Sequence, residues 1–181
     1  MPTRRSVLTT LTAATGTLIL PYRARADAHA PDTFQTPVGD VTIHPVQHAS
    51  FVIQTPEVAI YVDPVGGVEA YSALPNPNLV LITHEHGDHF DPVTLGAMMA
   101  GDVHLIANPA VAARTTDLSP EVLANGDATR WGNIGIEAIP AYNITEERKN
   151  FHPEGRDNGY VLTMGGFRIY VSGDTEDVPA M

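Results

Sequence analysis

The sequence predicts an α/β domain in which a mixed β-sheet is backed by helices. Short runs rich in β-branched residues alternate with segments that contain helix-capping residues, a pattern typical of strands and helices packed in layers. Gly165-Gly166 separates two such runs, and a two-residue glycine turn is typical of an antiparallel hairpin. No repeat with the period of a solenoid is present, so we expect one domain.

The first strands are expected to form an antiparallel meander, because they are short, apolar and separated by turns that contain proline. Residues 64–77 are rich in proline and glycine and predict a loop. Asp91-Pro92 predicts the start of a helix that ends near Gly101, and Asn108 predicts the cap of a second helix. The expected strands are 41–44, 49–54, 58–62, 79–83, 103–107, 134–141, 160–164 and 167–172, and the expected helices are 92–99, 109–114 and 119–123.

Residues 1–26 have the features of a twin-arginine export signal. Arg4 and Arg5 precede an apolar stretch of 13 residues at 8–20, and Ala24-Arg25-Ala26 provides a small-x-small cleavage site. A membrane-spanning helix needs about 20 apolar residues, so no stable membrane insertion is expected. The sequence therefore predicts a periplasmic or other extracytoplasmic protein exported by the twin-arginine route.

Composition limits the partners and the metal chemistry of the remaining chain. Residues 27–37 are rich in alanine, proline, aspartate and threonine, and we expect a disordered leader there, followed by the folded domain at 38–181. Without the signal, six basic and 21 acidic residues remain, a net charge of −15. This charge repels phosphate backbones, so nucleic acid is not an expected partner and a small-molecule substrate is. The chain has no cysteine, so a metal site has to use nitrogen and oxygen ligands.

Three histidines and one aspartate lie within six residues, directly after an apolar run that predicts a strand. Residues two apart in an extended segment point the same way, so His84 and His86 are expected to bind one ion. Gly87 begins a turn that directs Asp88 and His89 to a neighbouring position. The loop is therefore predicted to contribute to one or two metal ions, with Zn2+ expected and Mn2+ or Fe2+ as alternatives.

The His-x-His-x-Asp-His motif at 84–89 resembles the signature loop of the metallo-β-lactamase superfamily. Residues 58–64 are similar to the early strand of that family whose terminal acid, here Asp63, supports the metal loop. Residues 159–174 are similar to the hairpin that ends at the aspartate bridging both metal ions, here Asp174. The resemblance extends from about residue 41 to the C-terminus and implies an αββα sandwich.

The resemblance also implies the ligands of each site. The first site contains His84, His86 and a third imidazole, and the second contains Asp88, His89 and the shared Asp174. The expected ligands are thus His84, His86, Asp88, His89, His152 and Asp174.

The third imidazole and two further residues around the site follow from the same resemblance. The family usually places a histidine just after the strand at 134–141, where this sequence has Tyr142-Asn143. We therefore expect His152 to be the third ligand and Asn143 to be a hydrogen-bonding neighbour, because a neutral amide is a poor zinc ligand. His48 is expected to donate to a ligand or to shape the mouth of the site.

The family completes its second site with a later histidine, whereas every histidine of this chain lies at or before His152. The resemblance therefore implies that the C-terminal part of the fold is missing. A fragment of a longer protein is expected, with a naturally shortened form as the alternative.

The function implied by the resemblance is a metal-dependent hydrolase. A metal-bound hydroxide would attack an ester-like, amide or phosphodiester bond, and Asp88 would orient the hydroxide and take its proton. A mononuclear iron oxidoreductase of the same superfamily has the same loop and is one alternative. A non-catalytic metal-binding protein is another, because the last histidine is missing.

Overall fold

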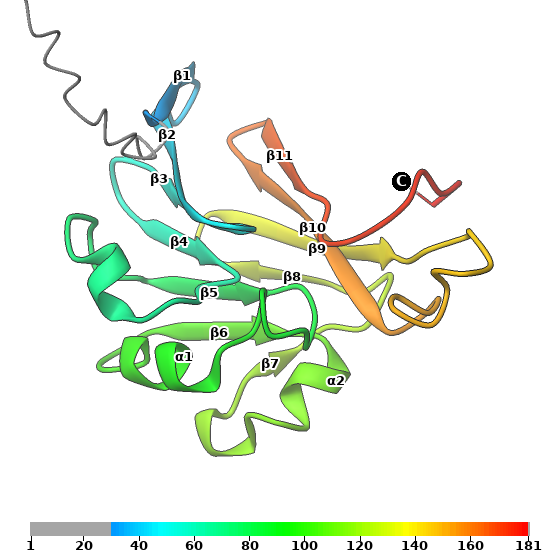
Figure 1. Ribbon diagram of the computed structural model, residues 1–181. Coiled ribbons are helices and arrows are strands. Elements are labelled where there is room, and N and C mark those ends of the chain that lie inside the picture. The colour runs from blue at the N-terminus through cyan, green and yellow to red at the C-terminus, as the bar shows by residue number, and fades with distance from the viewer. Residues whose placement is uncertain (1–29, 181) are drawn as a thin grey trace, which may run out of the picture.

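The computed structural model describes residues 30–180, which form two β-sheets packed face to face with helices outside the larger sheet (Figure 1). The larger sheet has the strand order β1-β2-β3-β4-β5-β6-β7 and the smaller one the order β11-β10-β9-β8. The larger sheet comprises β1 (Asp32–Thr36), β2 (Gly39–Gln47), β3 (Ser50–Gln54), β4 (Ala59–Val62), β5 (Leu79–Ile82), β6 (His104–Ala107) and β7 (Glu121–Val122). The smaller sheet comprises β8 (Ala128–Trp131), β9 (Ile134–Ala141), β10 (Asp157–Met164) and β11 (Phe167–Val171). The helical segments are α1 (Pro92–Met98), α2 (Pro109–Ala112) and the 3-10 helices η1 (Val68–Tyr71) and η2 (Thr116–Leu118).

The larger sheet is mixed, as predicted. Strands β1 to β4 pair antiparallel as a meander, and β4 to β7 pair parallel. In the smaller sheet β10 and β11 form the predicted hairpin, in which Gly165 and Gly166 have φ values of 55° and 87°. Two successive positive φ values are what a two-residue hairpin turn needs, and glycine adopts them without strain.

Strand β5 shows how the sequence builds two layers of core. All four of its side chains are completely buried. Leu79 and Leu81 pack between the two sheets, whereas Val80 and Ile82 pack against the helices. A strand buried on both faces has a continuous apolar run, and this one supplies the rigid base from which the metal loop begins.

Both α-helices begin where their capping residues predict. The Asp91 carboxylate accepts a hydrogen bond from the Val93 backbone N–H at 3.0 Å. The Asn108 side chain accepts one from the Val111 N–H at 2.8 Å. Each helix has proline at its first position, where no backbone donor is needed.

Two local predictions are wrong. The leader expected over 27–37 contains strand β1, which pairs along β2 and places the Thr33 and Thr42 hydroxyls 3.0 Å apart, so cross-strand pairing overrides its polar composition. The helix expected over 119–123 is instead strand β7, which pairs parallel with β6. Strand β8 was not predicted, because it is a short edge strand with exposed polar residues.

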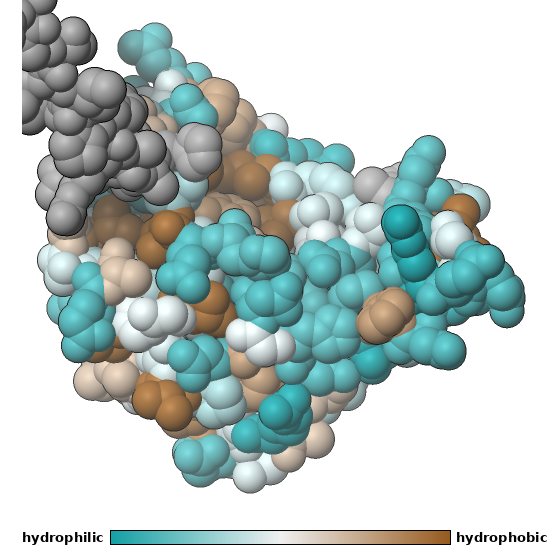
Figure 2. Space-filling view, viewed as in Figure 1, coloured by the Kyte–Doolittle hydropathy of each residue, from teal (hydrophilic) through white to brown (hydrophobic). Residues whose placement is uncertain are grey.

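The expected export signal lies outside the described residues. Within residues 30–180 no helix has both the length and the apolar character needed to cross a membrane. On the face in Figure 2, hydrophilic residues gather over the loop between β9 and β10 and around the chain that follows β11.

Candidate metal centre

The predicted metal loop follows β5 and meets the ends of several other strands. The Thr83 carbonyl accepts a hydrogen bond from the Asn158 N–H at the start of β10, at 3.1 Å. After β9 and β11, the Glu176 N–H donates to the Tyr142 carbonyl at 3.1 Å. These bonds bring the chain after β5, β9 and β11 to one end of the two sheets.

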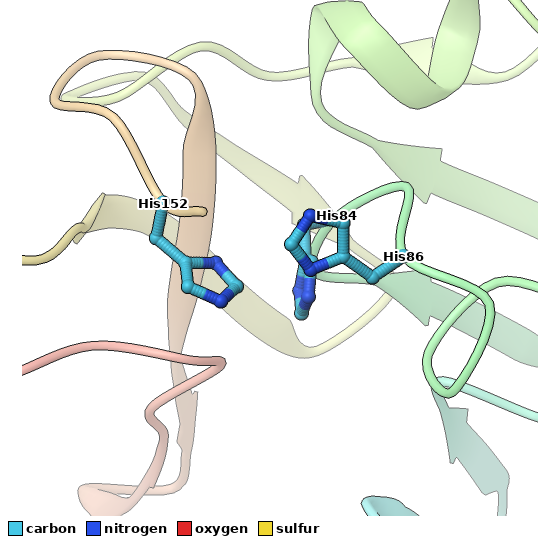
Figure 3. Close-up of side chains that lie close together, drawn as sticks. All are labelled: His84, His86 and His152. Atoms are coloured by element: carbon cyan, nitrogen blue, oxygen red, sulfur yellow. The ribbon is translucent and has the colours of Figure 1, made fainter. Parts of the chain in front are cut away.

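His84, His86 and His152 come together as the first metal site requires. Their rings point toward one another in Figure 3, with centroid distances of 4.7 Å between His84 and His86, 4.8 Å between His84 and His152, and 4.7 Å between His86 and His152. One ring nitrogen of each lies within 4.8 Å of the others. His152 reaches the site from the loop between β9 and β10, as the sequence predicted.

Asp88 and His89 face a neighbouring position together with His48. The His48 Nε2 lies 2.9 Å from an Asp88 carboxylate oxygen, and His89 lies edge-on to the His48 ring at 5.9 Å. Burial disfavours the charged form of Asp88, but its own backbone N–H and the nearby His89 hold the pKa of its carboxyl below the usual range. Asp88 is therefore ionised at neutral pH and available to a cation.

Asp174, just beyond β11, reaches both groups of residues. Its Oδ1 lies 3.2 Å from the His89 Nε2, and its Oδ2 lies 3.5 Å from the His152 Nε2. Gly173 allows this approach, since it has a φ of +60° and a Cβ there would lie 2.8 Å from the Asn158 carbonyl oxygen. One carboxylate thus offers an oxygen to each of two adjacent positions.

The residues at this end of the fold fit a metal ion. Among the described residues, His84 Nε2 and His89 Nε2 are buried and have no hydrogen-bond partner. Burial, together with the imidazoles of His89 and His152, lowers the pKa of His84 to about 2, so its ring is neutral at neutral pH. Buried polar atoms normally have partners, and an unpartnered neutral imidazole nitrogen has the lone pair that a metal ion binds.

The other ring nitrogens of the buried histidines have partners that fix the rings. The Asp63 carboxylate accepts from the Thr83 N–H at 2.7 Å and from the Thr83 hydroxyl at 2.6 Å, and it lies 2.8 Å from His89 Nδ1. The Thr83 hydroxyl also lies 3.0 Å from His84 Nδ1. Burial raises the pKa of Asp63, while these hydrogen bonds oppose that change. Asp63 therefore contacts the loop through Thr83 and His89, as the family resemblance implies.

Asp157 pairs with the Nδ1 of His152, as Asp63 pairs with that of His89. This role of Asp157 was not predicted from the sequence. Its Oδ2 lies 2.9 Å from His152 Nδ1, and the side chain is fully buried. Arg156 donates to Asp157 at 2.7 Å and lies 3.2 Å from the Glu85 carboxylate, so it joins the two loops that contain the candidate ligands. The sequence offered one signal for this role, which is that Arg156-Asp157 follows His152 closely in the chain.

The remaining polar residues singled out in the sequence lie as follows. The Asn143 side chain donates to the Arg148 carbonyl at 3.1 Å, and its backbone N–H donates to the His152 carbonyl at 2.9 Å. His44 pairs with Gln54 at 2.9 Å, and His104 lies 2.6 Å from Glu121, so both are engaged elsewhere. Asn143 thus supports His152 through the backbone.

A cavity of 460 Å³ leads to this group of residues. Its walls include Pro45 and Phe51 of the larger sheet and Tyr170 of the smaller one, together with His89 and Asp174. The cavity therefore borders the second position.

Comparisons with known proteins agree with this arrangement. The family model for the β-lactamase superfamily domain matches residues 42–180. Similar curated proteins include a UPF0173 metal-dependent hydrolase of Archaeoglobus fulgidus, 28% identical over 101 residues, and one of Thermococcus onnurineus, 30% identical over 135 residues. These matches cover 54% and 71% of this chain, but 44% and 58% of the relatives. The chain therefore spans about half the length of the curated relatives it matches.

Solved structures show the same fold. A candidate metal-dependent hydrolase of Parabacteroides distasonis is 41% identical, with a TM-score of 0.76, and the match covers 83% of this chain and 68% of that one. The metallo hydrolase Igni18 of Ignicoccus hospitalis is 21% identical with a TM-score of 0.60, covering 77% of this chain and 63% of that one.

Proposed function

Because this chain belongs to the β-lactamase superfamily domain family, we propose that it is a metal-dependent hydrolase that cleaves an ester-like, amide or phosphodiester bond of a small molecule. The observation that supports this most is the convergence of His84, His86 and His152 on one point, with Asp174 between that point and a second one. The cavity that His48, His89 and Asp174 line would give a substrate access to the second position.

Zn2+ is the proposed ion, because imidazole and carboxylate ligands suit it, and Mn2+ or Fe2+ are alternatives. His84, His86 and His152 would hold the first ion, Asp88 and His89 would contribute to a second, and Asp174 would contact both. A bound ion supplies Lewis acidity, which lowers the pKa of water and polarises the bond to be cleaved.

The chain's own residues supply orientation and proton transfer. The ionised, half-exposed Asp88, next to His48, would accept the proton of the attacking water and orient it. Asp63 and Asp157 each fix a histidine ring by its Nδ1, so that Nε2 points into the site.

The test is turnover of a chromogenic carboxylic ester and a chromogenic phosphodiester by zinc-loaded protein. His86→Ala is expected to lose first-site metal and activity together. His44→Ala is the matched control, because that ring contacts Gln54 and lies outside the metal cluster, and it should keep both. Activity that survives His86→Ala would refute the proposal.

Metal analysis separates the two alternative functions. Iron in protein purified without added metal, together with oxygen uptake, would indicate an iron oxidoreductase of the same superfamily. Tight metal binding without turnover of either substrate class would indicate a non-catalytic metal-binding protein.

We further propose a periplasmic location, based on the arginine pair Arg4-Arg5 and the apolar stretch that follows it. Replacement of both arginines by lysine should leave the protein in the cytoplasm of a bacterial host. Fractionation of cells that express the two forms checks this, and equal export of both would contradict it.

A further inference from the structure

His48 projects from the tight turn between β2 and β3 toward the metal loop. Its φ of +49° is in the left-handed region, which non-glycine residues seldom adopt, although histidine does so more often than most. The turn places the His48 Nε2 2.9 Å from the Asp88 carboxylate. The backbone conformation of the turn that connects β2 and β3 thus holds the ring near Asp88.

A buried nitrogen without a partner faces the same point. His89 is 1% exposed, its Nδ1 is paired with Asp63, and its Nε2 has no hydrogen-bond partner. That Nε2 lies 4.0 Å from the Asp88 carboxylate, and the ligand atoms of His48, Asp88 and His89 all lie within 4.8 Å of one another. Atoms at these separations can contact one central ion.

Asp174 borders this group through His89, although its oxygens lie outside the set of three atoms that are within 4.8 Å of one another. Its Oδ1 lies 3.2 Å from the His89 Nε2. Two imidazole nitrogens and two carboxylate oxygens make a four-ligand set of the kind that binds zinc tetrahedrally. Within residues 30–180, the two histidines outside the metal clusters, His44 and His104, are engaged with Gln54 and Glu121.

A simple surface ion pair accounts for less of this arrangement. The side chains of His48 and Asp88 are 59% and 50% exposed, and an exposed pair contributes little to stability. It also leaves the buried His89 Nε2 without a partner. A cation at the common point accounts for both observations.

We propose that His48 is a protein ligand of the second metal site, together with Asp88, His89 and Asp174. The proposal depends on metal binding by the proposed hydrolase, and it does not depend on which bond is cleaved. It assigns to this site an imidazole from the β2–β3 turn.

The test is metal titration of the chelator-treated chain with Zn2+ and with Co2+. Unmodified protein should bind two equivalents. His48→Gly and His48→Asn both tolerate a positive φ, so each removes the imidazole without straining the turn. Each should keep the first equivalent and bind the second at least about 100-fold more weakly, since loss of a direct ligand should cost no less than loss of a residue that only orients one. The Co2+ absorption spectrum of the second equivalent should change as well.

His44→Ala, on strand β2 just before this turn, is the matched control and should bind both equivalents as the unmodified protein does. Two unchanged equivalents in the His48 variants would overturn the proposal, as would equal weakening of both equivalents. If the unmodified protein fails to bind even a first equivalent of metal, the proposed function itself is refuted. The two failures are therefore distinguishable.

Discussion

Replacing Arg156 with leucine is expected to destabilise the metal-free chain by about 3 kcal/mol. Arg156 donates to both carboxylate oxygens of Asp157, at 2.7 and 2.9 Å, and lies 3.2 Å from Glu85. It also donates to the Phe151 carbonyl at 2.6 Å. One guanidinium thus holds the loop of His152 against the loop that contains Glu85.

The magnitude follows from the burial of Asp157. Its side chain is 0% exposed, whereas that of Arg156 is 27% exposed. Removal of one partner from a buried ion pair costs roughly 3–5 kcal/mol, because the other charge stays buried without its counterion. The partial exposure of Arg156 places the expected cost at the lower end of that range. For a chain of this size, about 3 kcal/mol lowers the melting temperature by roughly 6–12 °C.

Thermal unfolding of chelator-treated protein, followed by circular dichroism, measures this effect. Arg168→Leu is the matched control, because Arg168 is 62% exposed and lies 3.8 Å from Glu137. Its expected effect is within about 0.5 kcal/mol. Equal melting temperatures for the two variants would refute the argument that Arg156 joins the ligand loops.

Three further changes test other parts of the structure. Asp157→Asn removes the carboxylate that faces His152 Nδ1, and it should weaken zinc binding at the first site by about 10–100-fold in a chelator competition; unchanged affinity would contradict this role. Asp91→Ala removes the cap of α1 and should cost about 1 kcal/mol in a urea titration, whereas Asp102→Ala, in the loop after the helix, should cost little. Free zinc at about 100 times its dissociation constant should raise the free energy of unfolding by about 2.7 kcal/mol, and an unchanged melting curve would argue against a metal site in the folded state.

The strands and helices of this fold were largely predictable because their signals are local. The apolar run of β5, the Asp91-Pro92 cap and the Gly165-Gly166 turn each determine their own element, and all three have the predicted structure. Strands β1 and β8 lie at sheet edges with exposed polar residues, and pairing with a neighbouring strand stabilises them. Local composition therefore does not predict them.

In the candidate metal centre, too, local features were predictable from the sequence and long-range contacts were not. The candidate ligands of the loop are close in sequence, so spacing alone groups His84 with His86. The contacts of Asp157 with His152 and of Arg156 with Glu85 depend on how the β9–β10 loop folds against the β5 loop. No sequence period specifies that contact, and it becomes visible only in three dimensions.

X-ray absorption spectroscopy of protein loaded with one equivalent of Zn2+ tests the convergence of the three imidazoles most directly. The account predicts zinc–nitrogen distances of about 2.0–2.1 Å and the outer scattering of three histidine rings. It also predicts that one ring is lost in His152→Ala. A spectrum with only oxygen ligands, or one unchanged by His152→Ala, would contradict the account.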